Sequence, residues 1–494
     1  MKFSLLFFLC FLFSLSVQSQ LTELESFYPL YKITVPGKEP QILPKTLAIN
    51  DQMYTFASVT GSLEYFKGPN WEKIPKNQFS IISFQSNLDK RIISKPYGLF
   101  RGAVVNSTLD SAGKLYLTTT AKLHTTLPKK KTFEKQLDSD SIYVTCVLPS
   151  TSVQWSRSFG FTNASNIQFH TINFTKELAK VYFQAKDTLY QFDVDTQGSI
   201  VSQKRYAIPK THKVSFLATN LVDELIVLTT KTWGQYEISY EEQHLLITYN
   251  VLQTIKWQEY ISGTRFEVFI KSLLVDSKGT IYVIGNFLKE ITSDFTTVKS
   301  KGQQDIFIIK VSAQGKTVLV NGIGSEDGDN ISAVLMTSSN ELILSGQMYS
   351  SGTILNEKLE FFNQPFTFVA KISADNRIIF AKVFGGYSVL YPKITEDHYK
   401  RILLIGSYKD SLLVRDGRKL VSKGGNDFYL ATYDEYGNLE AYEPFGTTDD
   451  ESLILDCVFI PNNRFTLITY NSKSIPETKQ KEYSQVLWRY RYQR

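Results

Sequence analysis

The sequence contains few cysteines. Of the three, Cys10 lies in an apolar N-terminal segment, so Cys146 and Cys457 are the two that remain in the rest of the chain. So few cysteines exclude a disulfide-rich scaffold and a cysteine metal cluster. Stability must therefore come from a hydrophobic core, and we predict that both remaining thiols are buried and free.

Strong charge and catalytic motifs are also missing. The formal net charge is +6 over 494 residues, which slightly favours acidic partners and does not indicate nucleic-acid binding. No nucleophile elbow, zinc-binding His-Glu-x-x-His or glycine-rich phosphate loop occurs, and the five histidines form no spaced pair. We therefore predict a protein that is not an enzyme and needs no cofactor, although an axial hydrolase or lyase site built from several repeats remains open.

Long hydrophobic runs are absent except at the N-terminus. Lys2 precedes an apolar run at residues 5–15, and Val17-Gln18-Ser19 follows it. This pattern is typical of a secretory signal peptide, with cleavage before Gln20. We predict a signal peptide at residues 1–19, a single domain at residues 20–494, no membrane span after cleavage, and a secreted or secretory-lumen location.

The remainder contains a repeating unit of about 47 to 64 residues. One β-rich couplet occupies residues 270–276 and 280–285, and it returns at residues 331–346. A second couplet at residues 305–312 and 316–322 lies between these copies. Each unit therefore predicts four short strands, with tight turns between the first and second strands and between the third and fourth.

Turn chemistry supports this reading, because Asp or Ser is followed by Gly three residues later in several turns. A side-chain oxygen can bond a nearby backbone N–H, and Gly can adopt the positive φ that such turns need. The five pairs are Asp110/Gly113, Asp195/Gly198, Asp276/Gly279, Ser312/Gly315 and Asp434/Gly437. Four-stranded units at this spacing favour an all-β propeller of about eight blades, with seven blades as the alternative count and an open β-solenoid as the competing architecture.

The two ends of the chain are complementary. The last unit has three strands, at residues 453–460, 465–470 and 484–492, whereas a spare strand at residues 28–35 precedes the first unit. We predict that this N-terminal strand joins the last blade and closes the ring, because open terminal sheets would expose their edges.

The repeat resembles the SBBP-type β-propeller repeat of secreted and surface proteins. The resemblance is carried by Asp305-Ile-Phe-Ile-Ile-Lys-Val with residues 322–329, and more weakly by Phe384-Gly-Gly386 and Phe445-Gly446. It covers residues 270–471 well and the earlier part faintly. The family implies an extracellular seven-bladed propeller, and our count of eight departs from it.

In such a blade, the second-to-third and fourth-to-first connections share one face. The longest of them are residues 60–77, 119–135, 286–304, 347–363, 408–426 and 471–483. Variable loops on a rigid scaffold commonly carry function. We therefore predict a protein-interaction or scaffold module that binds through this long-loop face, with a glycan-binding propeller as the alternative.

Charged clusters on that face supply the candidate contacts. Clustered carboxylates suit hard cations such as calcium, and the candidates are Glu326, Asp327, Asp329, Asp449, Asp450 and Glu451. Basic side chains suit acidic glycans or protein partners, and the candidates are Lys129, Lys130, Lys131, Arg415, Arg418 and Lys419.

Four N-glycosylation sequons occur in the chain. Asn163 and Asn330 are predicted in fourth-to-first loops and are the glycan candidates. Asn106 and Asn173 are predicted in inner strands, where a glycan would not fit.

Overall fold

The computed structural model describes residues 22–492 with gaps at 36–44, 50–51, 59–61, 68–69, 75–78, 87–91, 101–103, 111, 113, 120–140, 149–152, 161–166, 176, 232–240, 265–266, 361–364, 386–389, 398, 414–418, 447–449, 461–463 and 476–479. All regular structure in these ranges is β-strand. A helix long and apolar enough to cross a membrane does not occur among them. The predicted signal peptide lies outside the described residues.

The strands form antiparallel sheets in which four consecutive strands usually pair in order, and we call such a set a four-strand unit. One sheet holds β2 (Lys45–Ile49), β3 (Gln52–Ser58), β6 (Phe79–Ser86) and β7 (Ile92–Phe100). The next holds β8 (Val104–Leu109), β9 (Leu115–Thr119), β10 (Ser141–Val147) and β11 (Val153–Gly160). A third holds β12 (Ile167–Phe174), β13 (Leu178–Ala185), β14 (Thr188–Asp195) and β15 (Ile200–Ala207).

The middle of the chain continues the series. A six-stranded sheet holds β16 (His212–Thr219), β17 (Leu225–Lys231), β18 (Glu241–Tyr249) and β19 (Ile255–Thr264), with β22 (Glu290–Ser293) and β23 (Thr296–Lys299) added beside β19. A four-stranded sheet follows with β20 (Val268–Val275), β21 (Ile281–Phe287), β24 (Asp305–Val311) and β25 (Thr317–Ile323).

The C-terminal part contains the largest sheet. It joins β26 (Asn330–Met336), β27 (Leu342–Met348), β30 (Phe366–Ile372) and β31 (Ile378–Gly385) to β32 (Leu390–Glu396), β33 (Ile402–Leu413), β34 (Lys419–Tyr433) and β35 (Leu439–Phe445). A separate two-stranded sheet holds β28 (Gly352–Ile354) and β29 (Glu357–Leu359). The last sheet has the order β36 (Asp450–Ile460), β37 (Arg464–Ile475), β38 (Gln480–Tyr492), β1 (Thr22–Val35), β4 (Ser62–Lys67) and β5 (Asn70–Ile74).

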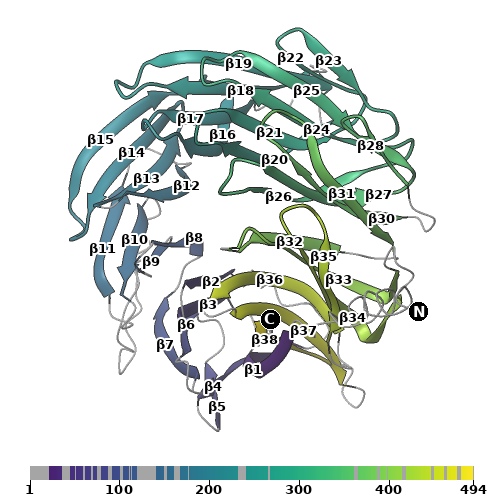
Figure 1. Cartoon of the computed structure of the whole chain (residues 1–494). Helices are drawn as coiled ribbons and strands as arrows, with labels where there is room; N and C mark the ends of the chain where they lie inside the picture. Colours follow the sequence, from purple (N-terminus) through teal and green to yellow (C-terminus); the bar gives the residue numbers. More distant parts are fainter. Residues whose placement is uncertain are drawn as a thin grey trace, which may run out of the picture.

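The first strands of successive units lie against one another. In chain order these contacts join β2, β8, β12, β16, β20, β26, β32 and β36, and β36 also lies against β2. The series of contacts thus returns to the strand where it began. Figure 1 shows the same arrangement, with the sheets following one another around a centre.

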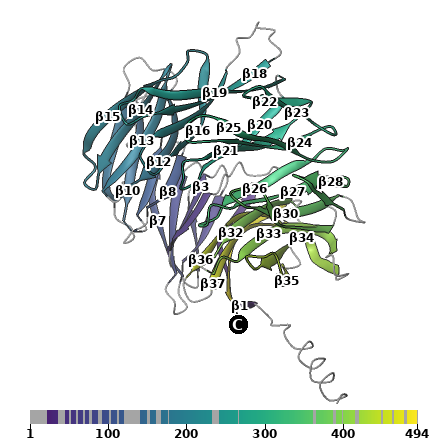
Figure 2. The ribbon, with the colours of Figure 1, turned by 45° about the horizontal axis from the view of Figure 1, so that its top comes forward.

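The N-terminal strand pairs with the last strand of the chain, as the sequence predicts. β1 runs antiparallel to β38 from Thr22 opposite Tyr492 to Val35 opposite Lys481. Figures 1 and 2 show β1 beside the C-terminal strands. Residues from the two ends therefore share one sheet, and the outer edge of β38 is covered.

The tight turns have the predicted chemistry. In the turn that begins at Asp195, the carboxylate Oδ1 accepts hydrogen bonds from the N–H groups of Gln197 (2.9 Å) and Ser199 (2.8 Å). Gly198 occupies the fourth position with φ +83°. Asp276, Ser312 and Asp434 begin turns of the same kind.

Several of the long second-to-third segments are hairpins rather than loops, which corrects the sequence interpretation. The hairpin β4–β5 pairs with β1, and β22–β23 pairs with β19. The β28–β29 hairpin lies against β25, and the extended β33–β34 hairpin meets β31 through Gly385 and Leu413. Each hairpin thus reaches back to the outer strand of the preceding unit and covers an edge that would otherwise be open to pairing.

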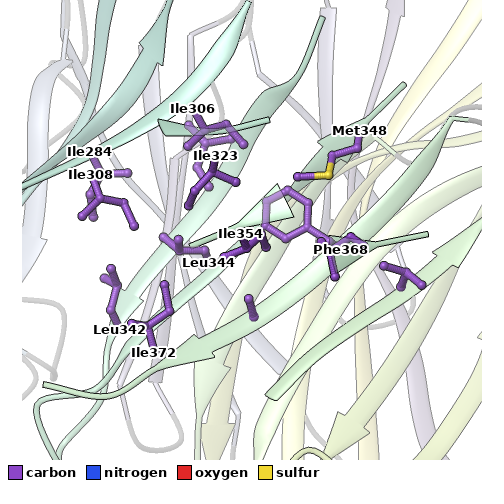
Figure 3. Close-up of a cluster of buried hydrophobic side chains, with 14 of the residues drawn as sticks. Ile284, Ile306, Ile308, Ile323, Leu342, Leu344, Met348, Ile354, Phe368 and Ile372 are labelled. Carbon is purple, nitrogen blue, oxygen red and sulfur yellow. The ribbon is translucent and has the colours of Figure 1, made fainter. Parts of the chain in front are cut away.

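The core lies between neighbouring units. One cluster joins β21 and β24 to β27 and β30, and it includes Ile284, Ile308, Leu344 and Phe368. Figure 3 shows these side chains gathered between the sheets. Because both faces of these sheets are covered, strands such as β21, β24 and β30 are buried along their whole length and show no strict alternation of apolar and polar residues.

In three units, an aromatic side chain at the third position of the fourth, outer strand packs against a glycine in a tight turn of the next unit. Trp257 in β19 packs over Gly315, and its indole N–H donates a hydrogen bond to the carbonyl of Ala313 (3.1 Å). Trp155 in β11 packs over Gly198 in the same way, and Phe380 in β31 packs over Gly437. A Cβ on Gly315 would lie 2.5 Å from the Trp257 ring, so the close approach requires glycine.

Cys146 is buried in β10, with no disulfide, as predicted. Burial raises the pKa of its thiol to about 11, so the thiol is protonated and unreactive at neutral pH. Cys457 lies in β36, and its side chain is outside the described residues.

Candidate functional site

The hairpin β22–β23 presents the most exposed large apolar side chain in the described part of the chain. Phe295, at its tip, is 100% exposed. Asp294 and Phe295 both have positive φ, +45° and +63°. This is the conformation of a two-residue hairpin turn, which strongly prefers Gly at its second position. A bulky residue at positive φ is uncommon, so the turn itself does not explain the phenyl ring.

Glu259 of β19 holds the tip of this hairpin. Its Oε1 accepts hydrogen bonds from the N–H of Asp294 (2.8 Å) and from the hydroxyl of Ser293 (3.2 Å). Burial raises the pKa of Glu259. The carboxylate therefore ties the hairpin turn to the outer strand of the preceding unit.

Asp305 holds the base of the same hairpin. It begins β24, its Oδ2 accepts a hydrogen bond from the N–H of Lys301 (2.9 Å), and it is fully buried. Gly324 packs directly on the carboxyl group, where a Cβ would lie 2.4 Å from Cγ. Oδ1 has no hydrogen-bond partner in the structure. Burial raises the pKa of Asp305, which favours the neutral acid.

Asp329 closes the segment beside Asp305. Its carboxylate accepts hydrogen bonds from the N–H of Ser325, the hydroxyl of Ser325 (2.9 Å) and the N–H of Tyr349 (3.2 Å). Burial raises the pKa of Asp329 to about 6, and the neighbouring charge of Asp305 adds to the effect. Both carboxylates are fully buried, so they position the surrounding backbone and do not face a substrate.

The arrangement of side chains around Asp305 recurs two units later in the chain. Asp427 in β34 is buried, its Oδ2 accepts a hydrogen bond from the N–H of Lys423 (2.6 Å), and Gly446 packs on its carboxyl group. The sequence signal is Ser-Lys-Gly-x-x-Asp, which occurs at residues 300–305 and 422–427. The sequence interpretation used both aspartates as strand starts but did not recognise them as clamps at the bases of the hairpins.

The structure does not bring the candidate cation ligands that it describes together into one site. Glu326 and Asp327 are exposed, whereas Asp329 is buried with its carboxylate occupied by Ser325 and Tyr349. No group of three His, Cys, Asp or Glu side chains in the described residues is arranged to hold a metal ion. Asp449 lies outside the described residues, and Asp450 and Glu451 begin β36 with side chains that are not described.

The basic candidates lie mostly outside the described residues, which exclude Lys129, Lys130, Lys131, Arg415 and Arg418. Lys419 is exposed at the start of β34. The basic loops therefore stay a prediction, and the candidate sites described above are those on the hairpins.

The structure describes three of the four glycosylation sequons, and all three lie in first strands of their units. Asn330 is exposed but begins β26 rather than lying in a loop. Asn163 lies outside the described residues. Asn106 and Asn173 lie in β8 and β12, the first strands of their units, as predicted.

Three histidines that the sequence leaves unassigned lie in neighbouring units. His170 is in β12, His212 begins β16 and His244 is in β18. Burial lowers the pKa of His170 and of His244 to about 4, so both rings are neutral at physiological pH. Thr230 lies 3.0 Å from Nδ1 of His244, and this pairing fits a packed histidine in the sheet.

Comparisons with known proteins give structural likeness only. No protein-family model and no curated protein sequence matches the chain. Prolyl oligopeptidase B from Galerina marginata has 8% identity and a TM-score of 0.41, with 92% of this chain and 56% of that chain covered. A prolyl endopeptidase structure has 10% identity and a TM-score of 0.41 over 89% of this chain and 53% of that chain. This chain thus spans about half the length of these two proteins.

A third match covers nearly all of its counterpart. The β-propeller domain of the trilobed protease from Pyrococcus furiosus has 9% identity and a TM-score of 0.36, with 84% of this chain and 97% of that chain covered. At these TM-scores the likeness carries no argument about activity, and the architecture rests on the strand order and contacts described above.

Proposed function

We propose that the chain is an eight-bladed β-propeller that binds other proteins in the secretory pathway or outside the cell. The count of eight is supported by the first-strand contacts that begin at β2 and return to it, and by β1 completing the unit of β36, β37 and β38. The location rests on the N-terminal apolar segment, and the binding role rests on Phe295.

Phe295 is the main support for this proposal, because it strains the hairpin turn and does not stabilise the isolated chain. A phenyl ring at positive φ, fully exposed, contributes no core packing, and strained residues of this kind cluster at binding sites. Aromatic anchors dominate protein interfaces, where they fill a pocket on the partner. Glu259 and Asp305 hold the tip and the base of the hairpin, so the backbone that carries the ring loses little freedom on binding.

The test uses a substitution that improves the turn while it removes the ring. Phe295→Gly places the preferred residue at this position, so the variant is expected to be at least as stable as the wild type. Immobilised full-length protein captures partners from a secretory-compartment extract, and mass spectrometry quantifies them. We expect at least a tenfold loss of specific partners with Phe295→Gly and retention with Phe295→Trp.

The matched control is Val201→Ser, which removes an exposed apolar side chain from β15 in a different unit. It is expected to capture the same partners as the wild type. Equal capture by Phe295→Gly and the wild type would remove the basis of the proposed function.

A further inference from the structure

A second apolar surface lies at the tight-turn end of the sheet that contains β16 to β19. Leu221 and Val222 occupy the turn between β16 and β17, and Val251 and Leu252 occupy the turn between β18 and β19. Leu221 is 81% exposed and Leu252 76% exposed, and both valines are more than half exposed. We call these four side chains the aliphatic tips.

The strand register places the two turns side by side. Leu225, which follows the first turn, pairs directly with Tyr249, which precedes the second. An ion pair of 2.8 Å between Glu224 and Lys256 also joins the two turns. The aliphatic tips therefore form one patch, and they belong to a surface distinct from Phe295.

The turn geometry does not require apolar tips. Seven other turns in the described part of the chain have the same backbone hydrogen bonds. Their second and third residues are Thr196 and Gln197, Ser277 and Lys278, Ala313 and Gln314, Ser338 and Ser339, Ala374 and Asp375, His398 and Tyr399, and Glu435 and Tyr436. Among these nine turns, only the two adjacent ones of the β16–β19 unit carry two branched aliphatic residues each.

Backbone N–H groups at the third, fourth and fifth positions of both turns are already engaged within the protein. Asn220 Oδ1 accepts hydrogen bonds from the N–H groups of Val222 (3.2 Å) and Glu224 (3.0 Å). Asn250 Oδ1 accepts them from Leu252 (3.0 Å) and Thr254 (3.1 Å). Backbone groups that are paired internally can enter an apolar medium at much lower cost than free ones.

The charged side chains beside the tips are paired as well. Asp223 forms an ion pair with Lys180, and Glu224 forms one with Lys256. The patch therefore presents exposed aliphatic side chains beside charges that are paired within the protein. Protein-binding hot spots favour Trp, Tyr and Arg over Leu and Val, whereas leucine and valine transfer favourably into hydrocarbon.

From this combination we propose that the aliphatic tips dock the protein on a lipid bilayer, with Leu221, Val222, Val251 and Leu252 inserted at the boundary between headgroups and acyl chains. The net charge of +6 favours an anionic surface and sets the approach. The aliphatic side chains supply the attachment, so binding persists on zwitterionic lipid and resists salt.

The experiment measures co-sedimentation of the full chain with vesicles of phosphatidylcholine alone and with vesicles that also contain phosphatidylserine. The test variant copies residues from the polar turns: Leu221→Ser, Val222→Lys, Val251→Thr and Leu252→Gln. Since these side chains are exposed, the variant keeps the wild-type unfolding midpoint. We expect at least a tenfold loss of partitioning on both vesicle types, and little change when salt is raised.

Val421→Ser serves as the matched control, because it removes another exposed apolar side chain, from β34 in a different unit, and leaves the aliphatic tips intact. It is expected to bind vesicles as the wild type does. The proposal is overturned if the wild type fails to bind either vesicle, or if the four-residue variant binds equally well. It is also overturned if light scattering shows a wild-type dimer that the four-residue variant dissolves, since the occupant would then be a second copy of the chain.

Discussion

Substitution of Gly315 by alanine tests how the units are locked together. Gly315 has φ +84°, and an added Cβ would lie 2.5 Å from Cδ2 and 2.6 Å from Cγ of Trp257. The left-handed backbone costs an L-residue about 1–2 kcal/mol. Overpacking against a ring that cannot retreat adds about 1–3 kcal/mol. We therefore expect Gly315→Ala to lower the free energy of unfolding by about 2–5 kcal/mol.

The measurement is urea unfolding of the full chain followed by circular dichroism, with a double-mutant cycle. In a Trp257→Leu background the ring is absent, so Gly315→Ala should retain only the backbone cost of about 1–2 kcal/mol. The difference between the two backgrounds isolates the contact between the ring and the turn.

Gln253 provides the matched control, because it occupies the same turn position with φ +66° and is not glycine. The third residue of the outer strand that precedes it is Ser202, which has no ring to place over the turn. Gln253→Ala is expected to cost less than about 1 kcal/mol, as most exposed substitutions do. An equal penalty for Gly315→Ala with and without Trp257 would refute the packing argument.

Three further predictions concern pH and chain closure. The pKa of Asp329 is raised to about 6 in the fold, so the folded state binds more protons than the unfolded state between about pH 4 and 6. The free energy of unfolding of the wild type should therefore rise relative to that of Asp329→Asn as the pH falls through this window, which urea unfolding would measure. Because burial lowers the pKa of His244 to about 4, the unfolded state binds the proton first, so stability should fall by up to roughly 3 kcal/mol between pH 7 and 4, and His244→Gln should flatten this loss in a thermal unfolding series. Deletion of residues 20–35 removes β1 and exposes the edge of β38, so size-exclusion chromatography should show oligomers that the full chain does not form.

The sequence was sufficient to predict the strands and turns because their signals are local. The Asp276 turn and the strands on either side of it follow from spacing and turn chemistry alone. The pairing of the N-terminal strand with the last one was also predictable. The last unit has three strands and the N-terminal segment has a spare one, so pairing the two completes a four-strand unit. β1 is longer than expected, since it begins at Thr22 rather than near Tyr28.

The hairpins and their clamps could not be predicted from the same reasoning. Residues 290–299 form two strands of four residues each, which are too short to show a period. They pair with β19, the outer strand of the preceding unit, which two further strands separate from them in the sequence. The pairing of Asp305 with the Lys301 N–H and its contact with Gly324 are likewise tertiary, although the repeated Ser-Lys-Gly-x-x-Asp pattern was a visible signal.

Departures from the repeat separate structural residues from functional candidates. Asp195, Asp276 and Asp434 begin turns with equivalent hydrogen bonds, so these residues serve the fold wherever they occur. Trp257 also has a structural cause, because Gly315 accommodates it.

Phe295 and the aliphatic tips have no such cause. Glycine would suit the β22–β23 turn better than phenylalanine, and seven turns with the same backbone hydrogen bonds use other residues at the positions of Leu221 and Leu252. In a repeat protein, equivalent positions in different units can be compared directly. A destabilising or exposed apolar residue that the equivalent positions lack is not required by the fold, so it points to selection for binding something outside the chain. By this reasoning the outer hairpin and the tight-turn end of the β16–β19 sheet act as independent surfaces, and the Phe295 and aliphatic-tip variants should lose different partners.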